Sequence, residues 1–311
     1  MKKWLWLAIL LLLTTASPLV GVAFPGAPVK IEVSAAAGGG MDIVARALAE
    51  RLAPRLGQPV LVSNRPGGGG LMAMMALKNA APDGYTLALV PSWTLSYQPL
   101  VTQHYQKSDF TLLATLYRAP DALIARGDAP WNSVAEMLAV ARASRQKLLF
   151  ASQGPVDRLI VNWLARQTDS KIAVMPTKGG GEMIPRLLGG HVDFAYSATM
   201  HTQYVSAGKI KVLASLADRR QSVAPEVPTL QEQGWNIALN TFFITLLPRN
   251  TPSPIAERLA GALQETMADE FIRALIEDKL MMNIDFRLSA AADALIEQQR
   301  AEMRIMLDAL Q

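Results

Sequence analysis

Residues 30–42 read Lys-Ile-Glu-Val-Ser-Ala-Ala-Ala-Gly-Gly-Gly-Met-Asp, a strand-forming run that passes through three glycines into a helical pattern. The first N–H groups of a helix have no intrahelical partner and carry a partial positive charge. Glycines let a ligand approach that backbone without meeting a Cβ atom. The stretch therefore predicts an anion-binding corner between a strand and a helix.

The same pattern occurs a second time just downstream. Apolar residues recur every four positions from Val44 to Leu56, which predicts one helical face, and Gly57 predicts the end of that helix. Residues 60–62 form a second strand that leads into the glycine-rich stretch 64–70. Two such loops after successive strands are expected at the carboxyl edge of one parallel sheet, where open α/β sheets bind ligands.

A second module of strand and helix signals begins near Ala119. Apolar runs at 148–152, 172–175 and 192–196 each lead into a loop of small or polar residues. The chain is expected to return to the first module near Thr241. Alternating strands and helices are typical of α/β proteins.

The sequence thus predicts two lobes, each a mixed, mainly parallel sheet flanked by helices, with a ligand cleft between them. The predicted division assigns 24–118 plus 241–311 to lobe 1 and 119–240 to lobe 2. After removal of the N-terminal segment discussed next, the chain is long enough for two well-buried cores.

Residues 1–23 predict an export signal. Lys2 and Lys3 form a positive start, and an apolar run from Trp4 to Leu13 follows, too short to span a bilayer comfortably. The chain contains no cysteine, which excludes lipid attachment at a cysteine, disulfides and thiolate chemistry. We expect a cleaved signal peptide and a free, unlipidated periplasmic protein; the alternative is an uncleaved membrane anchor.

Composition and motifs exclude several other classes of function. The net charge of +4 is not gathered in a basic run, which argues against nucleic-acid binding. His104, His191 and His201 have no metal-ligand spacing. Neither a G-x-S-x-G elbow nor a phosphate-binding P-loop occurs. We expect no catalytic residues, no metal and no cofactor.

An ordered series of short motifs extends over the chain that remains after residue 23. Its members are Ser34–Arg46, Asn64-Arg65-Pro66-Gly67, Ala81–Leu87, Lys178-Gly179, Leu187-Leu188-Gly189-Gly190 and Val227-Pro228-Thr229. This series resembles the solute receptors of tripartite tricarboxylate transporters, the Bug-type periplasmic binding proteins. One glycine loop is unspecific, but the whole series in this order is specific.

The resemblance implies a type II periplasmic-binding-protein fold without enzymatic activity. Such a receptor closes on a small, usually carboxylate-bearing solute and delivers it to membrane transporter subunits. Backbone groups, hydroxyls and bridging waters from both lobes are expected to hold the solute. By position, the residues expected to bind it are Ser34, Ala35, Ala36, Ala37, Gly38, Gly39, Asp42, Ser92, Trp93, Thr94, Ser152, Gln153, Lys178, Gly179, Gly180 and Ser197.

The chain departs from the family pattern in the expected ligand loops. Ser34, Ala35, Ala37 and Met41 stand where the family shows proline, phenylalanine, proline and threonine. Alanine in place of a ring enlarges the pocket or admits water, and the loss of two prolines frees the loop backbone. Trp93 replaces a glycine and either forms a stacking wall for a ring-bearing solute or belongs to the core.

Several polar residues have two interpretations each. Asp42 either caps the helix start, which would order the glycine loop, or contacts the solute. Arg65 either braces its loop or reaches the cleft. Glu182 either favours a helix terminus or meets a cationic group of the solute. Lys178 either pairs with a carboxylate or is solvated.

The sequence is also compatible with three alternatives, one of which is that the altered loops no longer bind any small solute. The protein could present its closed form to a sensor protein in place of a transporter. It could also be a serine-type hydrolase using Ser92 or Ser152, which requires a histidine and a carboxylate beside that serine. In each case we expect a monomer. The identity of the solute is not encoded in an obvious set of side chains, because backbone and water contacts dominate.

Overall fold

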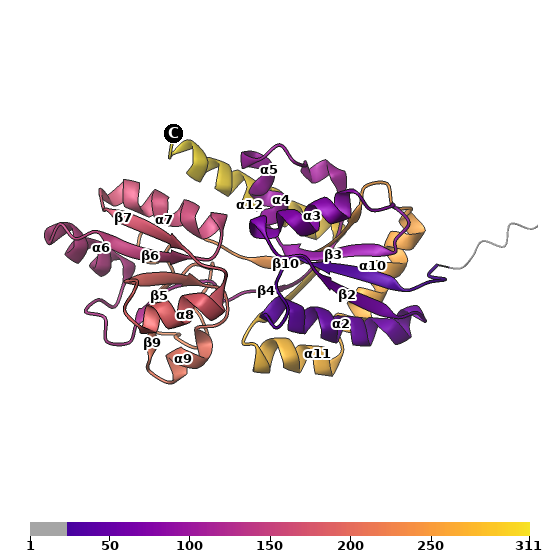
Figure 1. Cartoon of the computed structure of the whole chain (residues 1–311), viewed down its shortest axis with the longest axis horizontal. Coiled ribbons are helices and arrows are strands. Elements are labelled where there is room, and N and C mark those ends of the chain that lie inside the picture. Colours follow the sequence, from indigo (N-terminus) through magenta and orange to yellow (C-terminus); the bar gives the residue numbers. More distant parts are fainter. Residues whose placement is uncertain (1–23) are drawn as a thin grey trace, which may run out of the picture.

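The computed structural model describes residues 24–311 and contains two β-sheets that lie side by side along the long axis of the molecule (Figure 1). The predicted export signal lies outside the described residues. Within residues 24–311, no helix combines the length and the apolar character needed to cross a membrane.

The first lobe is built on a six-stranded sheet and the second on a five-stranded sheet. In spatial order the first sheet contains β11 (Asn283–Leu288), β4 (Phe110–Arg118), β10 (Phe242–Pro248), β3 (Thr86–Pro91), β1 (Val29–Val33) and β2 (Val60–Asn64). The second contains β7 (Ile172–Pro176), β6 (Leu148–Ser152), β8 (Phe194–Ser197), β5 (Ala122–Arg126) and β9 (Ile210–Ser215).

The strands that carry the predicted glycine loops are parallel, as expected. Ile31 of β1 lies opposite Val62 of β2 on one side and Leu87 of β3 on the other. The returning strands β10 and β4 run antiparallel to their neighbours, as does β5 in the second sheet. The predicted two-sheet α/β fold with mixed sheets is confirmed: β10 and β11 run against the other four strands of the first sheet, and β5 runs against the other four strands of the second.

Helices cover both faces of each sheet. In the first lobe these are α2 (Gly40–Leu56), α3 (Leu71–Lys78), α4 (Trp93–Ser96), α5 (Gln98–Val101), α10 (Ser253–Met267), α11 (Glu270–Ala274) and α12 (Ser289–Asp308). In the second they are α6 (Val134–Ala143), α7 (Pro155–Thr168), α8 (Gly180–Leu188) and α9 (Thr202–Ser206). Short 3₁₀ turns occur at Gly68–Gly70 and Lys107–Asp109, and a π-helical turn at Leu275–Lys279.

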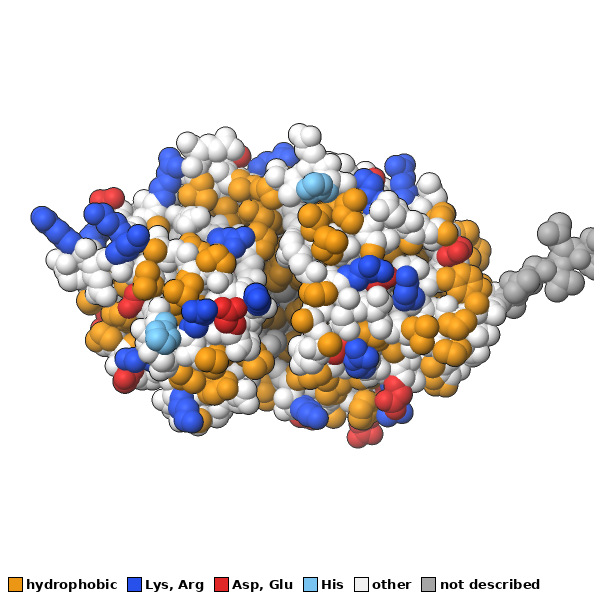
Figure 2. Space-filling model, in the orientation of Figure 1, with side chains coloured by type: hydrophobic (Ala, Val, Ile, Leu, Met, Phe, Trp, Pro, Cys, Tyr) orange, Lys and Arg blue, Asp and Glu red, His pale blue; other side chains and the backbone are white. Residues whose placement is uncertain are grey.

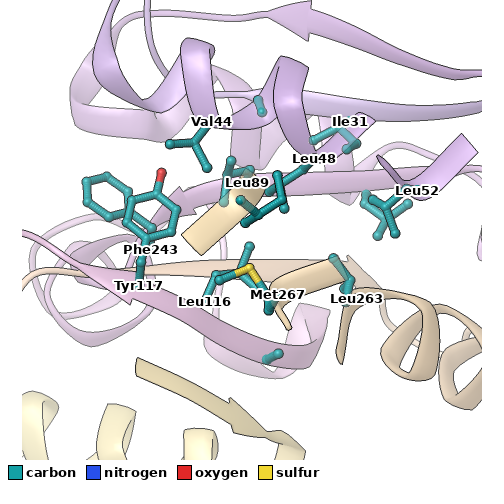
Figure 3. Close-up of a cluster of buried hydrophobic side chains, with 14 of the residues drawn as sticks. Ile31, Val44, Leu48, Leu52, Leu89, Leu116, Tyr117, Phe243, Leu263 and Met267 are labelled. Atoms are coloured by element: carbon teal, nitrogen blue, oxygen red, sulfur yellow. The ribbon is translucent and has the colours of Figure 1, made fainter. Parts of the chain in front are cut away.

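The first lobe has two hydrophobic cores, because successive side chains of a strand point to opposite faces of the sheet. Leu87 and Leu89 point to the face covered by α2 and α10, whereas Ala88 and Val90 point to the face covered by α3. Figure 3 shows the first core, where Leu48 of α2 packs among strand residues and the rings of Tyr117 and Phe243 stack. Gly57 ends α2 in the left-handed conformation, as predicted.

Two crossovers join the lobes, and we call them the hinge: residues 119–121 between β4 and β5, and residues 240–241 before β10. The division predicted at 119 and 241 stays a prediction; it falls between strands of different sheets. The end of α12 packs on the second lobe, since Met303 and Met306 belong to its core and Arg166 donates to the carbonyl of Leu310 at 2.6 Å.

Candidate functional site

The residues predicted to bind a solute lie at the carboxyl ends of β1, β3, β6, β7 and β8. These strand ends face each other from the two lobes, and Figure 2 shows a groove between the two halves of the molecule. Gly40 of α2 and Thr199, which follows β8, approach across it: a Cβ atom on Gly40 would lie 3.9 Å from Thr199 Oγ1. The groove between the sheets is therefore narrow at its base.

The first glycine loop is ordered by Asp42, the third residue of α2. This side chain is only 3 % exposed, and its carboxylate accepts hydrogen bonds from the N–H of Gly38 at 2.9 Å and from Arg46 Nε at 3.0 Å. Burial raises the pKa of Asp42, but the hydrogen bonds from Arg46, Gly38 and Asn64 outweigh it and hold the pKa below its usual value. The carboxylate is thus used within the loop, which is the capping role foreseen for it.

Asn64, at the end of β2, ties the same loop to the neighbouring strand. Its Nδ2 donates to the carbonyl of Ala35 at 3.0 Å and to Asp42 Oδ1 at 2.9 Å, and its Oδ1 accepts from Arg46. The next residue, Arg65, bonds the buried carboxylate of Glu32 at 2.9 Å. Arg65 therefore braces the sheet edge, and Asn64 is a loop-holding residue that sequence reasoning missed.

The second lobe uses the same device after β6. Asp157 is the third residue of α7, is 3 % exposed, and accepts from the N–H groups of Gln153 and Gly154 and from the Ser152 hydroxyl. Burial raises the pKa of Asp157 to about 6, although these hydrogen bonds lower it. The difference from Asp42 has a simple cause, since no cationic side chain pairs with Asp157 within residues 24–311.

A third acidic residue repeats the pattern at α8. Glu182 is again the third helical residue, and its carboxylate accepts from the N–H of Lys178 at 2.9 Å and from Arg186. These bonds lower the pKa of Glu182. Glu182 thus acts at the helix terminus, the first of its two interpretations. The ammonium group of Lys178 forms no ion pair within the described part of the chain.

The second glycine loop is held by side chains from α4 and α5. The indole N–H of Trp93 donates to the carbonyl of Gly69 at 3.0 Å, and Gln98 Nε2 donates to the carbonyls of Gly68 and Gly69 at 2.8 Å. Tyr105 in turn donates to Gln98 Oε1. The ring of Trp93 is partly buried and packs against the core of the second lobe. Its position fits both a structural role and a role as one side of the solute pocket.

Four of the predicted hydroxyl ligands are buried and already engaged. Thr94 donates to the carbonyl of Pro91, and Ser152 to Gly154 and Asp157. Ser92 accepts from the N–H of Phe242, and Ser197 lies 3.1 Å from His201 Nδ1. The groups left at the cleft are the backbone of the two glycine-rich loops, the partly buried Ser34 and the exposed Lys178, whereas Gln153 Nε2 donates to the carbonyl of Tyr196 at 2.8 Å.

The Ser197 and His201 pair is not a hydrolase site. His201 is fully buried, and its Nε2 meets the amide oxygen of Gln221 at 2.8 Å where a triad would have a carboxylate. Burial lowers the pKa of His201 to about 4, which leaves the ring neutral. Ser152 is paired with Asp157, and Ser92 has no hydrogen bond to a histidine, so the arrangement required for hydrolysis is absent from the described residues.

One contact across the groove and one charge near it were not foreseen from the sequence. A Cβ atom on Gly69 would lie 3.1 Å from Pro155 Cδ, so the second glycine loop touches the start of α7. Arg158 of α7 carries a charge that lowers the pKa of Tyr97 in the first lobe, although burial raises it more. Arg158 forms no side-chain hydrogen bond or ion pair within residues 24–311.

A buried network links the end of β8 to the hinge. Asp121 is fully buried; its Oδ1 accepts from the Tyr196 hydroxyl at 2.5 Å and its Oδ2 from the N–H of Thr241 at 2.8 Å. Burial raises the pKa of Asp121 to about 7, against the effect of these bonds. One carboxylate therefore fixes both crossovers to the sheet of the second lobe. Its partners lie 75 and 120 residues away, and no local sequence signal identifies them.

Comparison with known proteins agrees with this architecture. The family model described as "Tripartite tricarboxylate transporter family receptor" matches residues 44–308. The "UPF0065 protein in gbd 5'region" of Cupriavidus necator is 33% identical over 248 residues, which cover 78% of this chain and 76% of that protein.

Two solved structures show the same fold. The periplasmic binding protein BugD superposes with a TM-score of 0.80 and 28% identity, covering 92% of this chain and 98% of that one. MatC from Rhodopseudomonas palustris, solved with bound malate, gives a TM-score of 0.78 and 27% identity, covering 93% of this chain and 100% of that one.

Proposed function

This chain belongs to the tripartite tricarboxylate transporter receptors, and from that premise we propose that it captures a small carboxylate-bearing solute between its lobes and delivers it to membrane transporter subunits. Receptors of this family bind solutes and are not enzymes. The proposal concerns the chemical class of the solute, its place of binding and the partner that receives it.

The observation that carries the proposal is that α2, α7 and α8 all begin at the groove, each just after a glycine. The opening N–H groups of a helix lack intrahelical partners and suit an anion. The carboxylates of Asp42, Asp157 and Glu182 partly cancel the positive charge at the starts of these helices. Hydrogen bonds from the backbone N–H groups therefore contribute more to binding of the solute than the electrostatic field of the helices. A carboxylate held in this way can leave when the lobes part.

Two cationic side chains support the same class of solute. Lys178 and Arg158 lie at the start of α8 and α7, and neither forms an ion pair within the described residues. Either can pair with a carboxylate that reaches beyond the backbone donors. Among the structures of similar fold, MatC was solved with malate, a dicarboxylate, and this supports the assignment.

We further propose that the protein acts in the periplasm as a free receptor. The motif at residues 1–23 and the absence of cysteine support export without lipid attachment. The family supports transporter subunits as the receiving partner. A cognate transporter reconstituted in vesicles should take up solute only when this protein is added.

The test is thermal unfolding of the purified protein, refolded to remove carried ligand, against dicarboxylates, tricarboxylates, aromatic carboxylates, acidic amino acids and their amides. A solute that binds only the native state stabilises it by about 2.7 kcal/mol at a hundred times its Kd. We expect a concentration-dependent rise in the unfolding midpoint with one carboxylate class and none with the matching amides. A rise with amides alone would refute the carboxylate assignment.

Gly40→Leu should weaken solute binding without changing stability. Position 40 opens α2 with an ordinary backbone conformation, so a leucine is tolerated there, but its side chain enters the space toward Thr199. We expect about a tenfold weaker Kd, which is about 1.4 kcal/mol, for the solute found above. Calorimetric titration measures this.

The matched control for that substitution is Gly261→Leu, because Gly261 is also helical and has open space around it. Its affinity and unfolding midpoint should equal those of the parent. Equal affinity in Gly40→Leu and the parent would place the solute outside the groove.

A further inference from the structure

A second cavity, of about 230 Å³, lies at the hinge. One wall is the first crossover and the other is the loop that follows β9. Its polar lining comes from Arg118, Ser215, Arg219, Arg220, Gln221, Ser222 and Asn283. Arginine thus supplies three of these seven side chains.

Arg118 is the least expected member of this lining, because it is only 3 % exposed. One of its nitrogens, Nη1, donates to Asp218 at 3.1 Å, whereas its Nη2 is buried and has no hydrogen-bond partner within residues 24–311. Burying a charged donor without a partner is costly. Native structures retain such groups where another ligand can satisfy them.

Each of the three arginines already has an acidic partner. Arg219 pairs with Asp218 at 3.5 Å, the same carboxylate that serves Arg118, and Arg220 pairs with Glu232 at 2.9 Å. The buried Asp121 also lies within electrostatic range of Arg118. The feature that favours an anion is therefore the unsatisfied Nη2 of Arg118, since a guanidinium donor pairs well with an oxyanion.

This cavity is separate from the groove that holds the proposed carboxylate site. None of the residues predicted to bind that solute lines it. The solute loops follow β1 and β3 in the first sheet and β6, β7 and β8 in the second. The cavity lies at the same sheet edges but to one side, where β4 and β9 end, two strands away from β3 in the first sheet and two strands away from β8 in the second.

We propose that the hinge cavity binds a small oxyanion such as inorganic phosphate, bridged by Arg118 of the first lobe and by Arg219 and Arg220 of the second. The guanidinium fork matches phosphate oxygens in pairs, and Ser222 and Asn283 add neutral hydrogen-bonding groups. An anion held in this way ties the two lobes together beside the crossovers. Its occupancy is therefore coupled to any change in the angle between the lobes.

The experiment is calorimetric titration of the whole purified protein with inorganic phosphate at constant ionic strength, with sulfate and malate as parallel probes. We expect one saturable phosphate site. Arg219→Ala and Arg220→Ala, both at exposed positions, should each weaken it about tenfold, the effect of losing one charged hydrogen bond. Arg304→Ala, an exposed arginine of α12 outside the cavity, should leave it unchanged.

Two results would overturn the proposal. One is phosphate affinity that is equal in Arg219→Ala, Arg220→Ala and Arg304→Ala, or absent in the parent. The other is loss of phosphate binding in Gly40→Leu, which would place the anion in the groove. Arg118→Gln is informative only if it folds, so the surface variants decide the outcome. Failure of the carboxylate assignment would leave these phosphate measurements unaffected.

Discussion

Replacing Asp42 with alanine should lower the free energy of unfolding by about 3 kcal/mol, the scale set by hydrogen bonds to a buried charged group. The substitution removes the acceptor for the Gly38 N–H, for Arg46 and for Asn64 together. The glycine loop would then order only when solute binds, and that ordering would reduce the measured affinity. Denaturant unfolding and calorimetric titration measure the two effects.

The exposed residue Asp278 provides the matched control, because Asp278→Ala removes a carboxylate that forms no hydrogen bond or ion pair within residues 24–311. The effect of Asp42→Ala should also depend on pH. The pKa of Asp42 is held below its usual value of 3.8, so its contribution to stability is complete above that pH and is lost as the pH falls through the folded-state pKa. Parent and variant should therefore converge in strong acid. A constant difference down to that range would contradict the proposed role.

Tyr196→Phe should destabilise the protein by about 3 kcal/mol at about pH 8, where Asp121 is ionised, and by much less at about pH 5. The hydroxyl of Tyr196 is one of two donors to the fully buried Asp121. Asp121 has its folded-state pKa raised to about 7 from 3.8. The folded protein thus binds this proton more firmly than the unfolded chain, and stability decreases as the pH rises from about 4 to 7. Losing a donor to the carboxylate raises that pKa further and enlarges the decrease.

Tyr117→Phe is the matched control, since Tyr117 is equally buried but its hydroxyl has no partner within residues 24–311. Its ring stacks on Phe243, as Figure 3 shows, and phenylalanine preserves that contact. We expect no loss of stability at either pH, because an unpaired buried hydroxyl is removed. Equal losses in the two variants would show that the Tyr196 hydroxyl has no special role at the hinge.

The sequence predicted what is local. Asp42 follows the glycines by a few residues at a helix start, so its capping role could be inferred from spacing. The spacing of apolar residues predicts the strands and helices of the two lobes, and the glycine and proline residues between them predict the loops at the strand ends. Strand β11 has no prediction from the sequence, because it is short, contains no buried residue and lies between the long helices α10 and α12.

Long-range contacts account for the rest. Gln98 and Trp93 bond a loop 24 to 30 residues away, and Asp121 meets Thr241 at a separation of 120 residues. Position in the resembled family predicted Ser92, Thr94, Ser152 and Ser197 as ligands; their hydroxyls are buried and have protein partners in this structure, and their contact with a solute stays a prediction. A hydroxyl near a cleft has two possible directions, and the choice depends on which carbonyl or carboxylate the completed fold places beside it.

The acidic residue at the third position of α2, α7 and α8 has an evolutionary consequence. Because Asp42, Asp157 and Glu182 order their loops from within, the exposed side chains of these loops, such as those at positions 36 and 37, contribute little to folding. Mutations there can change what is recognised while the scaffold stays intact. A gene duplicate of such a receptor can therefore acquire a new nutrient in few steps, without passing through unstable intermediates.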